Sequence, residues 1–355
     1  MSHRPTLIFV GGFLGAGKTT LILAAARELE RRGLRTAVIL NDQGDSLVDT
    51  ELTRLHGMDA EEVTRGCFCC RFSDLMAKAE QLRAHSPYVV FAEPVGSCTD
   101  ISATTLQPIR SAHHGDYALA PFTVLVDPGR ARVLLGPDAD PDLAFLFQKQ
   151  LEEADLVCFT KSDLYPEPPE LPATRARQLS AKTGQGVSAW LDELLSGRLA
   201  VAGRVLDIDY EQYARAEAAL AWLNLEATLQ LDVAISPAMV VGPLLDRLSE
   251  QLVAAEIPIV HLKAVDETAD GFVKAALCAS GQEPAVEGAL DASPALWHEL
   301  LLNLRASGQP ERVREIVELE INRLGGRLTG LQISCFRPAA PRPEHRIARV
   351  VGEPS

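Results

Sequence analysis

Residues 12–19 read GFLGAGKT, which fits the pattern G-x-x-x-x-G-K-[ST] of a phosphate-binding loop. A continuous apolar run at residues 6–12 precedes the loop, and residues 19–33 follow it with apolar side chains at helical spacing. Glycines let backbone N–H groups turn around phosphate oxygens, and the helix that follows directs its positive end at them. The alternative, a glycine-rich turn with an accidental Lys-Thr pair, fits this strand and helix context less well.

The motif assigns an expected role to each of its polar residues. We expect Lys18 to bridge the β- and γ-phosphates as a catalytic residue, and the Thr19 hydroxyl to ligate Mg²⁺. The residues expected to contact the nucleotide phosphates are Gly12, Gly15, Ala16, Gly17, Lys18, Thr19 and Thr20.

Further short apolar runs alternate with helical patterns up to about residue 195. These runs occupy residues 36–42, 88–94, 122–128 and 156–163. They are nearly continuous in Ile, Val, Leu and Phe, which is typical of strands buried on both faces of a parallel sheet. The sequence therefore predicts a doubly wound, mostly parallel α/β domain over residues 1–200.

The pattern changes near residues 196–210, which predict a linker. Strand patterns then occur at residues 221–231, 259–265, 272–280, 296–307 and 331–338, and helical patterns at residues 236–256 and 309–326. This order predicts a smaller α+β domain of split-βαβ, ferredoxin-like type with one extra strand over residues 205–337. Residues 338–355 are rich in Pro and Arg and predict a flexible tail.

Composition limits the classes of partner. The 355 residues carry a formal net charge of -14, which argues against nucleic acid or an anionic membrane as a partner. No apolar run reaches the roughly 18–20 residues of a membrane span. Glycines interrupt the apolar run near the amino terminus, which favours a buried strand over a secretion signal. We therefore expect a cytoplasmic protein.

Residues 159–164, FTKSDL, are similar to the Asn-Lys-x-Asp element of GTP-binding proteins. Asp163 can accept hydrogen bonds from guanine N1 and the exocyclic amine, and Lys161 can lie along the ring plane. Thr160 stands where Asn is usual, so a hydroxyl replaces an amide.

Residues 179–187, LSAKTGQGV, resemble the Ser-Ala-Lys loop of the same proteins. Ser180, Ala181 and Lys182 are therefore expected near the base, with the Ala181 backbone N–H meeting guanine O6. Adenine offers a donor at that position, so the two segments together predict GTP and GDP as ligands.

Residues 65–71, RGCFCCR, bring together three of the seven cysteines of the chain. A loop hinged at Gly66 could turn the sulfurs of Cys67, Cys69 and Cys70 inward. Three thiolates suit Zn²⁺, Co²⁺ or Cu⁺, and they leave an open fourth position that suits transfer of the ion. The alternatives are a redox dithiol pair and inert packing cysteines.

The surroundings of the thiols suggest further residues. Arg65 and Arg71 flank the cysteines and would favour their thiolate forms. Candidate fourth ligands are Cys98 and His56, and His113 and His114 are adjacent on a predicted loop. Each of these four is as well explained without a metal.

The motifs, in this order, resemble those of the CobW-type GTPases, relatives of the accessory GTPases that assist nickel and cobalamin enzymes. The resemblance covers about residues 5–195, and its segments are residues 11–20, 39–45, 66–70, 93–96 and 150–164. It implies a metal-handling, slowly hydrolysing GTPase whose Cys-x-Cys-Cys loop binds the metal. Beyond residue 200 only the general layout is similar, and the His-rich tract of some members is absent.

The resemblance also implies roles at the γ-phosphate. Glu93 would hold a Mg²⁺-bound water or orient the attacking water, and Gly96 would donate its N–H to the γ-phosphate. Asp42 and Asp45 follow the second strand, where family members place acidic residues near Mg²⁺ or the transported metal. Asp127 ends another strand and is an equally good turn or helix cap.

These observations predict a GTPase that carries a transition metal of the Zn²⁺ or Co²⁺ class and couples GTP hydrolysis to its transfer to a client metalloprotein. A homodimer is possible. The alternatives are a P-loop kinase acting on a small molecule and a GTP-dependent regulator or scaffold without metal. GTP turnover measured with and without metal distinguishes the three.

Overall fold

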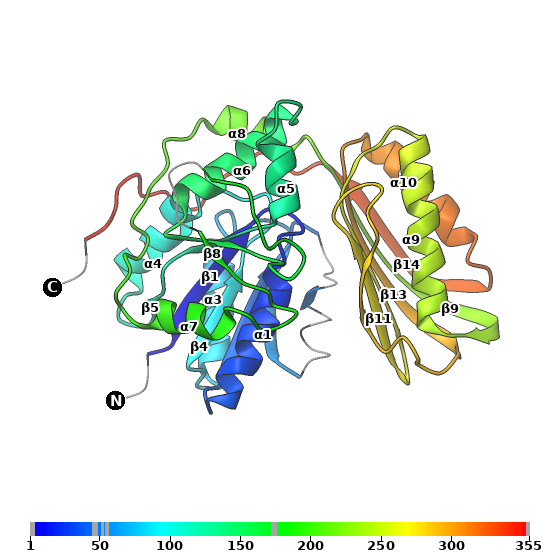
Figure 1. The fold of residues 1–355 in the computed structure, drawn as a ribbon, viewed down its shortest axis with the longest axis horizontal. Coiled ribbons are helices and arrows are strands. Elements are labelled where there is room, and N and C mark those ends of the chain that lie inside the picture. Colours follow the sequence, from blue (N-terminus) through cyan, green and yellow to red (C-terminus); the bar gives the residue numbers. More distant parts are fainter. Residues whose placement is uncertain (1–3, 45–48, 51–52, 54–56, 172–175, 353–355) are drawn as a thin grey trace. The chain divides into compact units, whose positions relative to one another are not determined.

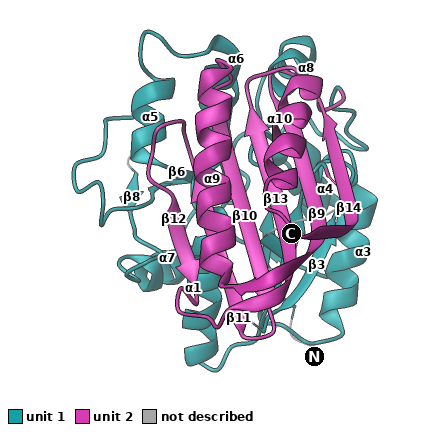
Figure 2. Cartoon of the chain, turned by 90° about the vertical axis from the view of Figure 1, so that its right-hand side faces the viewer, with its two compact units in different colours: residues 1–43, 49–217, 340–355 teal, residues 44–48, 218–339 magenta. Residues whose placement is uncertain are grey.

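The computed structural model describes residues 4–44, 49–50, 53, 57–171 and 176–352 and divides the chain into two compact units (Figure 1). Unit 1 comprises Met1–Gln43, Asp49–Glu217 and Ala340–Ser355, and unit 2 comprises Gly44–Val48 and Ala218–Ala339. Figure 2 colours the two units separately. The boundary lies after Glu217 rather than near residue 200, because helix α8 (Tyr210–Glu217) packs against helix α6 (Pro141–Glu153) of unit 1.

Unit 1 is built on an eight-stranded sheet with the order β3-β2-β4-β1-β6-β7-β8, in which β5 also pairs with β1. Its strands are β1 (Thr6–Gly12), β2 (Thr36–Asn41), β3 (Asp59–Val63), β4 (Val89–Glu93), β5 (Ala118–Leu119), β6 (Thr123–Val126), β7 (Leu156–Phe159) and β8 (Arg177–Gln178). The described strand pairs are all parallel, so the predicted doubly wound parallel sheet is confirmed. The carboxyl ends of β2, β4, β1, β6 and β7 therefore lie along one edge of the sheet.

Strand β3 was not predicted, because its sequence DAEEV lacks an apolar run. Only Val63 among its residues is buried, and within the described part of the chain the strand pairs with β2 alone, at the edge of the sheet. An edge strand needs fewer apolar side chains than a central one, so its pattern is weak. The strand carries the chain to the thiol loop, beside the end of β2.

Helices connect these parallel strands. They are α1 (Lys18–Arg31), α3 (Phe72–Arg83), the π-helical turn η1 (Ser102–Leu106), α4 (Gln107–Ala112), α5 (Pro128–Leu134), α6, α7 (Val187–Leu195) and α8. Helix α1 buries Leu21, Ala25 and Leu29, which recur every four residues and face β1, β2 and β4. This packing fixes the start of α1 directly after the phosphate loop.

Unit 2 is a six-stranded antiparallel sheet with the order β12-β11-β10-β13-β9-β14. Its elements are β9 (Ala221–Ile235), α9 (Pro237–Ala254), β10 (Ile259–Thr268), β11 (Gly271–Leu277), β12 (Ala285–Gly288), β13 (Ala295–Ala306), α10 (Pro310–Asn322) and β14 (Arg327–Phe336). The split-βαβ arrangement is formed by β9, β10, β13 and β14 with the two helices, and β11 and β12 extend its edge. The short, exposed strand β12 was not predicted.

The core of unit 2 lies between its sheet and its two helices, which cover the same face (Figures 1 and 2). Leu244, Leu248 and Leu252 of α9 are fully buried against strand residues such as Leu302 and Leu304. In the described part of the chain, no helix is both long and apolar enough to cross a membrane.

Candidate functional site

The phosphate loop has the backbone geometry that its glycines predict. Gly12, Gly15 and Gly17 have φ angles of 133°, 79° and 88°, a region that L side chains rarely adopt. A Cβ on Gly12 would lie 2.5 Å from the carbonyl oxygen of Leu125 on the neighbouring strand. Gly17 directly precedes α1, so the amino end of the helix opens onto the loop.

The side chains that follow the loop point back toward it. Lys18 is buried, and its Nζ donates a hydrogen bond to the Gly12 carbonyl at 3.0 Å. The Thr19 hydroxyl donates to both carboxylate oxygens of Glu93, at 2.9 and 3.2 Å, and Lys18 Nζ lies 3.9 Å from Glu93 Oε1. The structure thus brings Lys18, Thr19 and Glu93 together from α1 and the end of β4. A hydroxyl and a carboxylate are oxygen ligands that suit Mg²⁺.

Gly96 packs tightly against the phosphate loop. A Cβ at this position would lie 2.8 Å from Leu14 Cδ2 and 3.1 Å from Lys18 Nζ, so a larger residue would push the segment away. The side-chain amide of Gln150 donates to the carbonyls of Gly96 and Cys98 at 3.0 and 2.9 Å. Sequence reasoning did not identify Gln150, because it lies on the buried side of α6 without any local motif.

Asp42 lies at the end of β2 and is buried. Its backbone N–H donates to the Val63 carbonyl at 3.2 Å, and the neighbouring Leu40 is in register with Glu93. Asp42 therefore lies at the sheet edge that carries Glu93. Asp45, the second acidic residue of this segment, lies outside the described residues.

The first of the two segments expected to recognise the base is joined to the phosphate loop. The Thr160 hydroxyl donates to the carbonyl of Ala16 at 2.9 Å. Lys161 Nζ lies 2.5 Å from Asp127 Oδ2, and the other oxygen of Asp127 accepts from the Arg130 N–H at the start of α5. Asp127 is thus a helix cap that also holds Lys161.

The second segment expected to recognise the base lies beside the first one. The Ser162 N–H donates to the Leu179 carbonyl at 3.2 Å, which brings Asp163 and Ser180 to the same region. The exposure of these side chains differs: Ser180 is buried, Ala181 is half-buried, and Asp163 and Lys182 are exposed. Exposed Asp163 is open to contact with a base.

The three cysteines of the thiol loop converge. The sulfurs of Cys67, Cys69 and Cys70 all lie within 4.8 Å of one another, and this is the cluster of potential metal ligands found among the described residues. The sulfur separations are 2.7 Å for Cys67 to Cys69, 3.4 Å for Cys67 to Cys70 and 3.6 Å for Cys69 to Cys70. Gly66 supports the predicted hinge with a φ of 152°, and Cys70 is the least buried of the three.

Hydrogen bonds among the three thiols shift their pKa values in opposite directions. The Cys69 and Cys70 thiols lower the pKa of Cys67 well below its ordinary value. Hydrogen bonds with Cys67 and Cys70 raise the pKa of Cys69. The hydrogen bond with Cys67 raises the pKa of Cys70 to about 11. These contacts make Cys67 the most acidic of the three thiols. Arg71 instead forms an ion pair with Asp74 at 2.6 Å.

Asn41 at the end of β2 anchors the thiol loop. Its amide Nδ2 donates to the carbonyls of Val63 and Gly66 at 2.8 and 2.7 Å. Its Oδ1 accepts from the Phe68 N–H at 2.8 Å. The sequence indicated Asp42 but not its neighbour Asn41. The hydrogen-bond partners of Asn41 lie in β3 and the loop after it, and β3 was not predicted.

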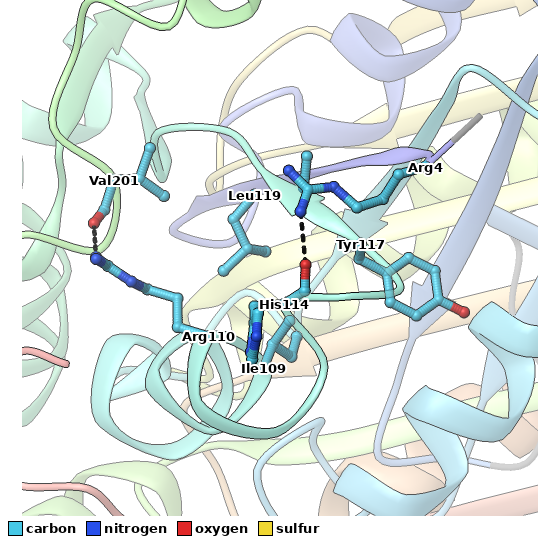
Figure 3. A pocket seen from close by; sticks show the side chains of 8 residues that line it. Arg4, Ile109, Arg110, His114, Tyr117, Leu119 and Val201 are labelled. Carbon is cyan, nitrogen blue, oxygen red and sulfur yellow. Dashed lines mark hydrogen bonds between the residues drawn. The ribbon is translucent and has the colours of Figure 1, made fainter. Parts of the chain in front are cut away.

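The candidate fourth ligands are placed differently. Cys98 is buried, and it is not one of the three sulfurs that lie within 4.8 Å of one another. His56 lies outside the described residues. His114 lines a pocket with Arg4 and Arg110, and the guanidinium of Arg4 donates to the His114 carbonyl at 2.6 Å (Figure 3). His113 lies with its ring centroid 6.2 Å from that of Phe72 and is not part of the thiol cluster.

Residues 340–352 differ from the predicted flexible tail, because they make defined contacts with unit 1. The Arg342 N–H donates to Cys70 Sγ at 3.1 Å, and the Glu344 N–H donates to the Cys69 carbonyl at 2.9 Å. Composition alone suggested flexibility, whereas specific long-range hydrogen bonds hold this segment.

The sheet order and the phosphate loop define a P-loop nucleotide-binding protein with a GTPase-type fold. Residues 6–186 match the family described as CobW/HypB/UreG, nucleotide-binding domain, and the chain belongs to this family.

Individual relatives match over shorter parts. The zinc chaperone CobW of a Sinorhizobium species is 31% identical over 44% of this chain and 50% of that protein. The zinc chaperone YjiA of Escherichia coli strain K12 is 40% identical over 19% of this chain and 21% of that protein. The chain thus matches about half the length of these relatives or less. The solved structure of HypB from Helicobacter pylori in complex with nickel is 17% identical with a TM-score of 0.41, over 55% of this chain and 87% of that chain.

Proposed function

We propose that this chain is a GTP-hydrolysing metallochaperone that binds a zinc-class ion through Cys67, Cys69 and Cys70. The observation that carries the proposal is the convergence of these three sulfurs within 4.8 Å. Their loop is anchored by Asn41 at the end of β2, the strand next to β4. The similarity to the zinc chaperones CobW and YjiA supports zinc over other borderline ions.

The proposed hydrolysis uses residues that the fold already brings together. Thr19 and Glu93 would hold Mg²⁺, which supplies charge neutralisation between the β- and γ-phosphates. Lys18 would exchange its bond to the Gly12 carbonyl for the phosphate oxygens. Glu93 would orient the water that attacks the γ-phosphorus, while the bond from the γ-phosphorus to the β-phosphate oxygen breaks and GDP and phosphate leave.

Recognition of the guanine base would come from the other end of the site. Asp163 would accept from guanine N1 and the exocyclic amine, and Lys161, held by Asp127, would lie along the ring. Ala181, between Ser180 and Lys182, would donate its N–H to guanine O6. The bond from Thr160 to Ala16 supports this reading, because it joins the base side and the phosphate side of the site.

The proposed coupling between nucleotide and metal follows from shared supports. Asn41, which precedes Asp42, forms hydrogen bonds to the thiol loop. Gly96, two residues before Cys98, packs on the phosphate loop. Loss of the γ-phosphate would shift both segments and change metal affinity, and the coupling must be reciprocal. The ion would then pass to a client metalloprotein.

A metal titration tests this proposal. Co²⁺ is added to the full chain in its apo, GDP-bound and GTP-analogue-bound forms, and absorption is read in the thiolate-to-Co²⁺ charge-transfer region. We expect one site per chain, with affinities that differ between nucleotide states by roughly 5–150-fold. Cys67→Ser, Cys69→Ser and Cys70→Ser should each weaken the band, and Cys278→Ser in unit 2 should not.

GTP turnover completes the test. Hydrolysis to GDP and phosphate without a phosphorylated acceptor supports a GTPase and excludes a small-molecule kinase. A chain that hydrolyses GTP but shows no thiolate band would be a GTPase without metal, and the metallochaperone proposal would be wrong.

A further inference from the structure

The carboxyl-terminal segment of the chain lies against the thiol loop. The Arg342 backbone N–H donates a hydrogen bond to Cys70 Sγ at 3.1 Å, and the Glu344 backbone N–H donates to the Cys69 carbonyl at 2.9 Å. Cys70 is the least buried of the three clustered cysteines. The segment therefore contacts the thiol cluster at the cysteine that is most open to solvent.

Two side chains fasten the segment to the helix that follows the thiol loop. The Glu344 carboxylate accepts from the backbone N–H of Ser73 at 3.0 Å and from its hydroxyl at 2.6 Å. Ser73 lies in the first turn of α3, where a carboxylate also interacts favourably with the positive end of the helix. The ring of His345 lies edge-on to that of Phe72 in the same turn, with ring centroids 5.1 Å apart. The segment is thus bound to the loop and to the start of α3.

A buried carboxylate anchors the segment a second time, in the chain that follows β4. The Arg346 guanidinium donates to Asp100 Oδ2 at 2.8 Å and to the Leu206 carbonyl at 2.9 Å. The side chain of Asp100 is 0% exposed, and the Tyr210 hydroxyl donates to the same oxygen at 2.7 Å. Among the described residues, Arg346 is the cation that pairs with this carboxylate. Removing a cation from a buried carboxylate is costly, so this contact opposes opening of the segment.

Backbone hydrogen bonds continue beyond this anchor. The Ile347 N–H donates to the Ala103 carbonyl at 2.9 Å, and the Val351 N–H donates to Gln107 Oε1 at 2.7 Å, at the start of α4. None of residues 342–352 is itself buried. A segment that is held by separate polar contacts and contributes little to the core can open locally while the rest of the domain stays folded.

We propose that residues 342–351 form a strap that closes the thiol cluster, and that this strap must lift from Cys70 before a bound metal ion is released. This inference rests on the proposed metallochaperone function and adds to it the part of the chain that controls release. With the strap in place, the N–H of Arg342 holds the Cys70 sulfur in position as a ligand.

Lifting the strap opens Cys70 to an incoming ligand. The bond from the ion to the Cys70 sulfur then breaks as a bond to a ligand of the acceptor forms, and no electrons are transferred. The thiolate that leaves the ion takes up a proton from solvent. The other two cysteines are buried, so exchange would begin at Cys70.

Zinc removal from the full chain tests the strap. The Zn²⁺-loaded chain is mixed with a chromophoric chelator, in an excess at which the rate no longer depends on chelator concentration. Arg346→Ala should release zinc about tenfold faster than the wild type, because the strap loses its contact with a buried charge. Glu344→Ala should release zinc about threefold faster, because its hydrogen bonds to Ser73 are exposed to solvent.

Two further variants control this measurement. Arg349→Ala should match the wild type, because this exposed arginine of the same segment makes no side-chain hydrogen bond or ion pair among the described residues. Ser73→Ala removes the hydroxyl that donates to Glu344. The double variant of Ser73→Ala and Glu344→Ala should release zinc no faster than Glu344→Ala alone, because the two side chains act through one contact.

Amide hydrogen exchange of the zinc-free chain measures the strap without a metal. Peptides that cover residues 342–351 should exchange about tenfold faster in Arg346→Ala and about threefold faster in Glu344→Ala. They should exchange at the wild-type rate in Arg349→Ala. Unchanged exchange of β1 and β4 shows that each variant is otherwise folded.

The outcomes separate the strap from the proposed function. Wild-type rates of zinc release in variants whose segment exchanges faster would overturn the strap and leave the metallochaperone proposal intact. Wild-type exchange of residues 342–351 in both variants would also overturn the strap. A wild type that binds no zinc would overturn the proposed function and the strap with it. If Arg346→Ala destabilises the chain around Asp100, the exposed substitution Glu344→Ala decides the question.

Discussion

The hydroxyl of Thr160 donates a hydrogen bond to the carbonyl oxygen of Ala16 at 2.9 Å. Ala16 belongs to the phosphate loop and Thr160 begins the segment that we propose recognises the base, so one buried hydrogen bond joins these two segments. A threonine can therefore connect these two segments where the similar GTP-binding element has an asparagine.

The first prediction concerns nucleotide choice. Calorimetry with Mg²⁺ should show GTP and GDP bound at least about tenfold tighter than ATP and ADP, which is about 1.4 kcal/mol. Asp163→Asn should remove most of this preference, because an amide cannot accept from both guanine donors. Thr160→Ala should weaken the binding of guanine and adenine nucleotides alike, because it removes the hydrogen bond to Ala16 of the phosphate loop. Equal affinities in the wild type would show that the guanine assignment is wrong.

The second prediction concerns the phosphate loop. Lys18→Ala should abolish tight nucleotide binding, because the phosphates lose their nearest cation. Thr19→Ala should mainly reduce the Mg²⁺-dependent part of the affinity, because its hydroxyl lies against Glu93. Both are measured as nucleotide affinity with and without Mg²⁺, with Lys149→Ala on α6 as the control. Wild-type GTP turnover in Lys18→Ala would contradict the assignment.

The third prediction concerns the anchor of the thiol loop. Asn41→Ala removes the three hydrogen bonds that Asn41 makes to Val63, Gly66 and Phe68. At about 1 kcal/mol each, this should lower the free energy of unfolding of the apo protein by roughly 2–4 kcal/mol and weaken Co²⁺ binding. Urea denaturation measures the first effect and the charge-transfer band the second.

Asn322→Ala is the control for Asn41→Ala, because this exposed asparagine makes a single described hydrogen bond, to the Glu318 carbonyl. It should change the free energy of unfolding by less than about 1 kcal/mol. Unaltered metal affinity in Asn41→Ala would show that the loop holds its shape without this anchor.

The fourth prediction concerns pH. Burial raises the pKa of Glu153 from 4.5 to about 8. The folded state therefore holds a proton that the unfolded state releases, and the free energy of unfolding should fall between about pH 4.5 and pH 8, by up to about 1.4 kcal/mol per pH unit. Glu153→Gln should remove the one proton that Glu153 contributes to this difference, so the decrease in the free energy of unfolding per pH unit should become smaller by up to about 1.4 kcal/mol. Urea denaturation of the apo protein across this pH range measures the change.

Burial likewise raises the pKa of Glu217 to about 7, so part of the slope should persist in Glu153→Gln. Glu152→Gln, one residue away and exposed, should leave the slope as it is in the wild type. A slope that Glu153→Gln does not alter would mean that Glu153 is ionised in the folded protein.

Several features of this protein are determined by short contiguous stretches of sequence. The phosphate loop needs glycines at positions with positive φ, and the buried parallel strands need continuous apolar runs. Both features can therefore be predicted from the sequence. The convergence of Cys67, Cys69 and Cys70 also follows from one loop. The edge strands β3 and β12 escaped prediction because strands at a sheet edge can remain polar.

Only the tertiary structure determined which residues distant in the sequence contact these motifs. Gln150 contacts Cys98 from 52 positions away, and Arg342 contacts Cys70 from 272 positions away. Such contacts depend on the order of the strands and on the path of the chain over them, and each involves a single polar residue that repeats in no pattern. A lone glutamine or a proline-rich tail has no local sign of its partner, because the partner becomes a neighbour only when the sheet has formed.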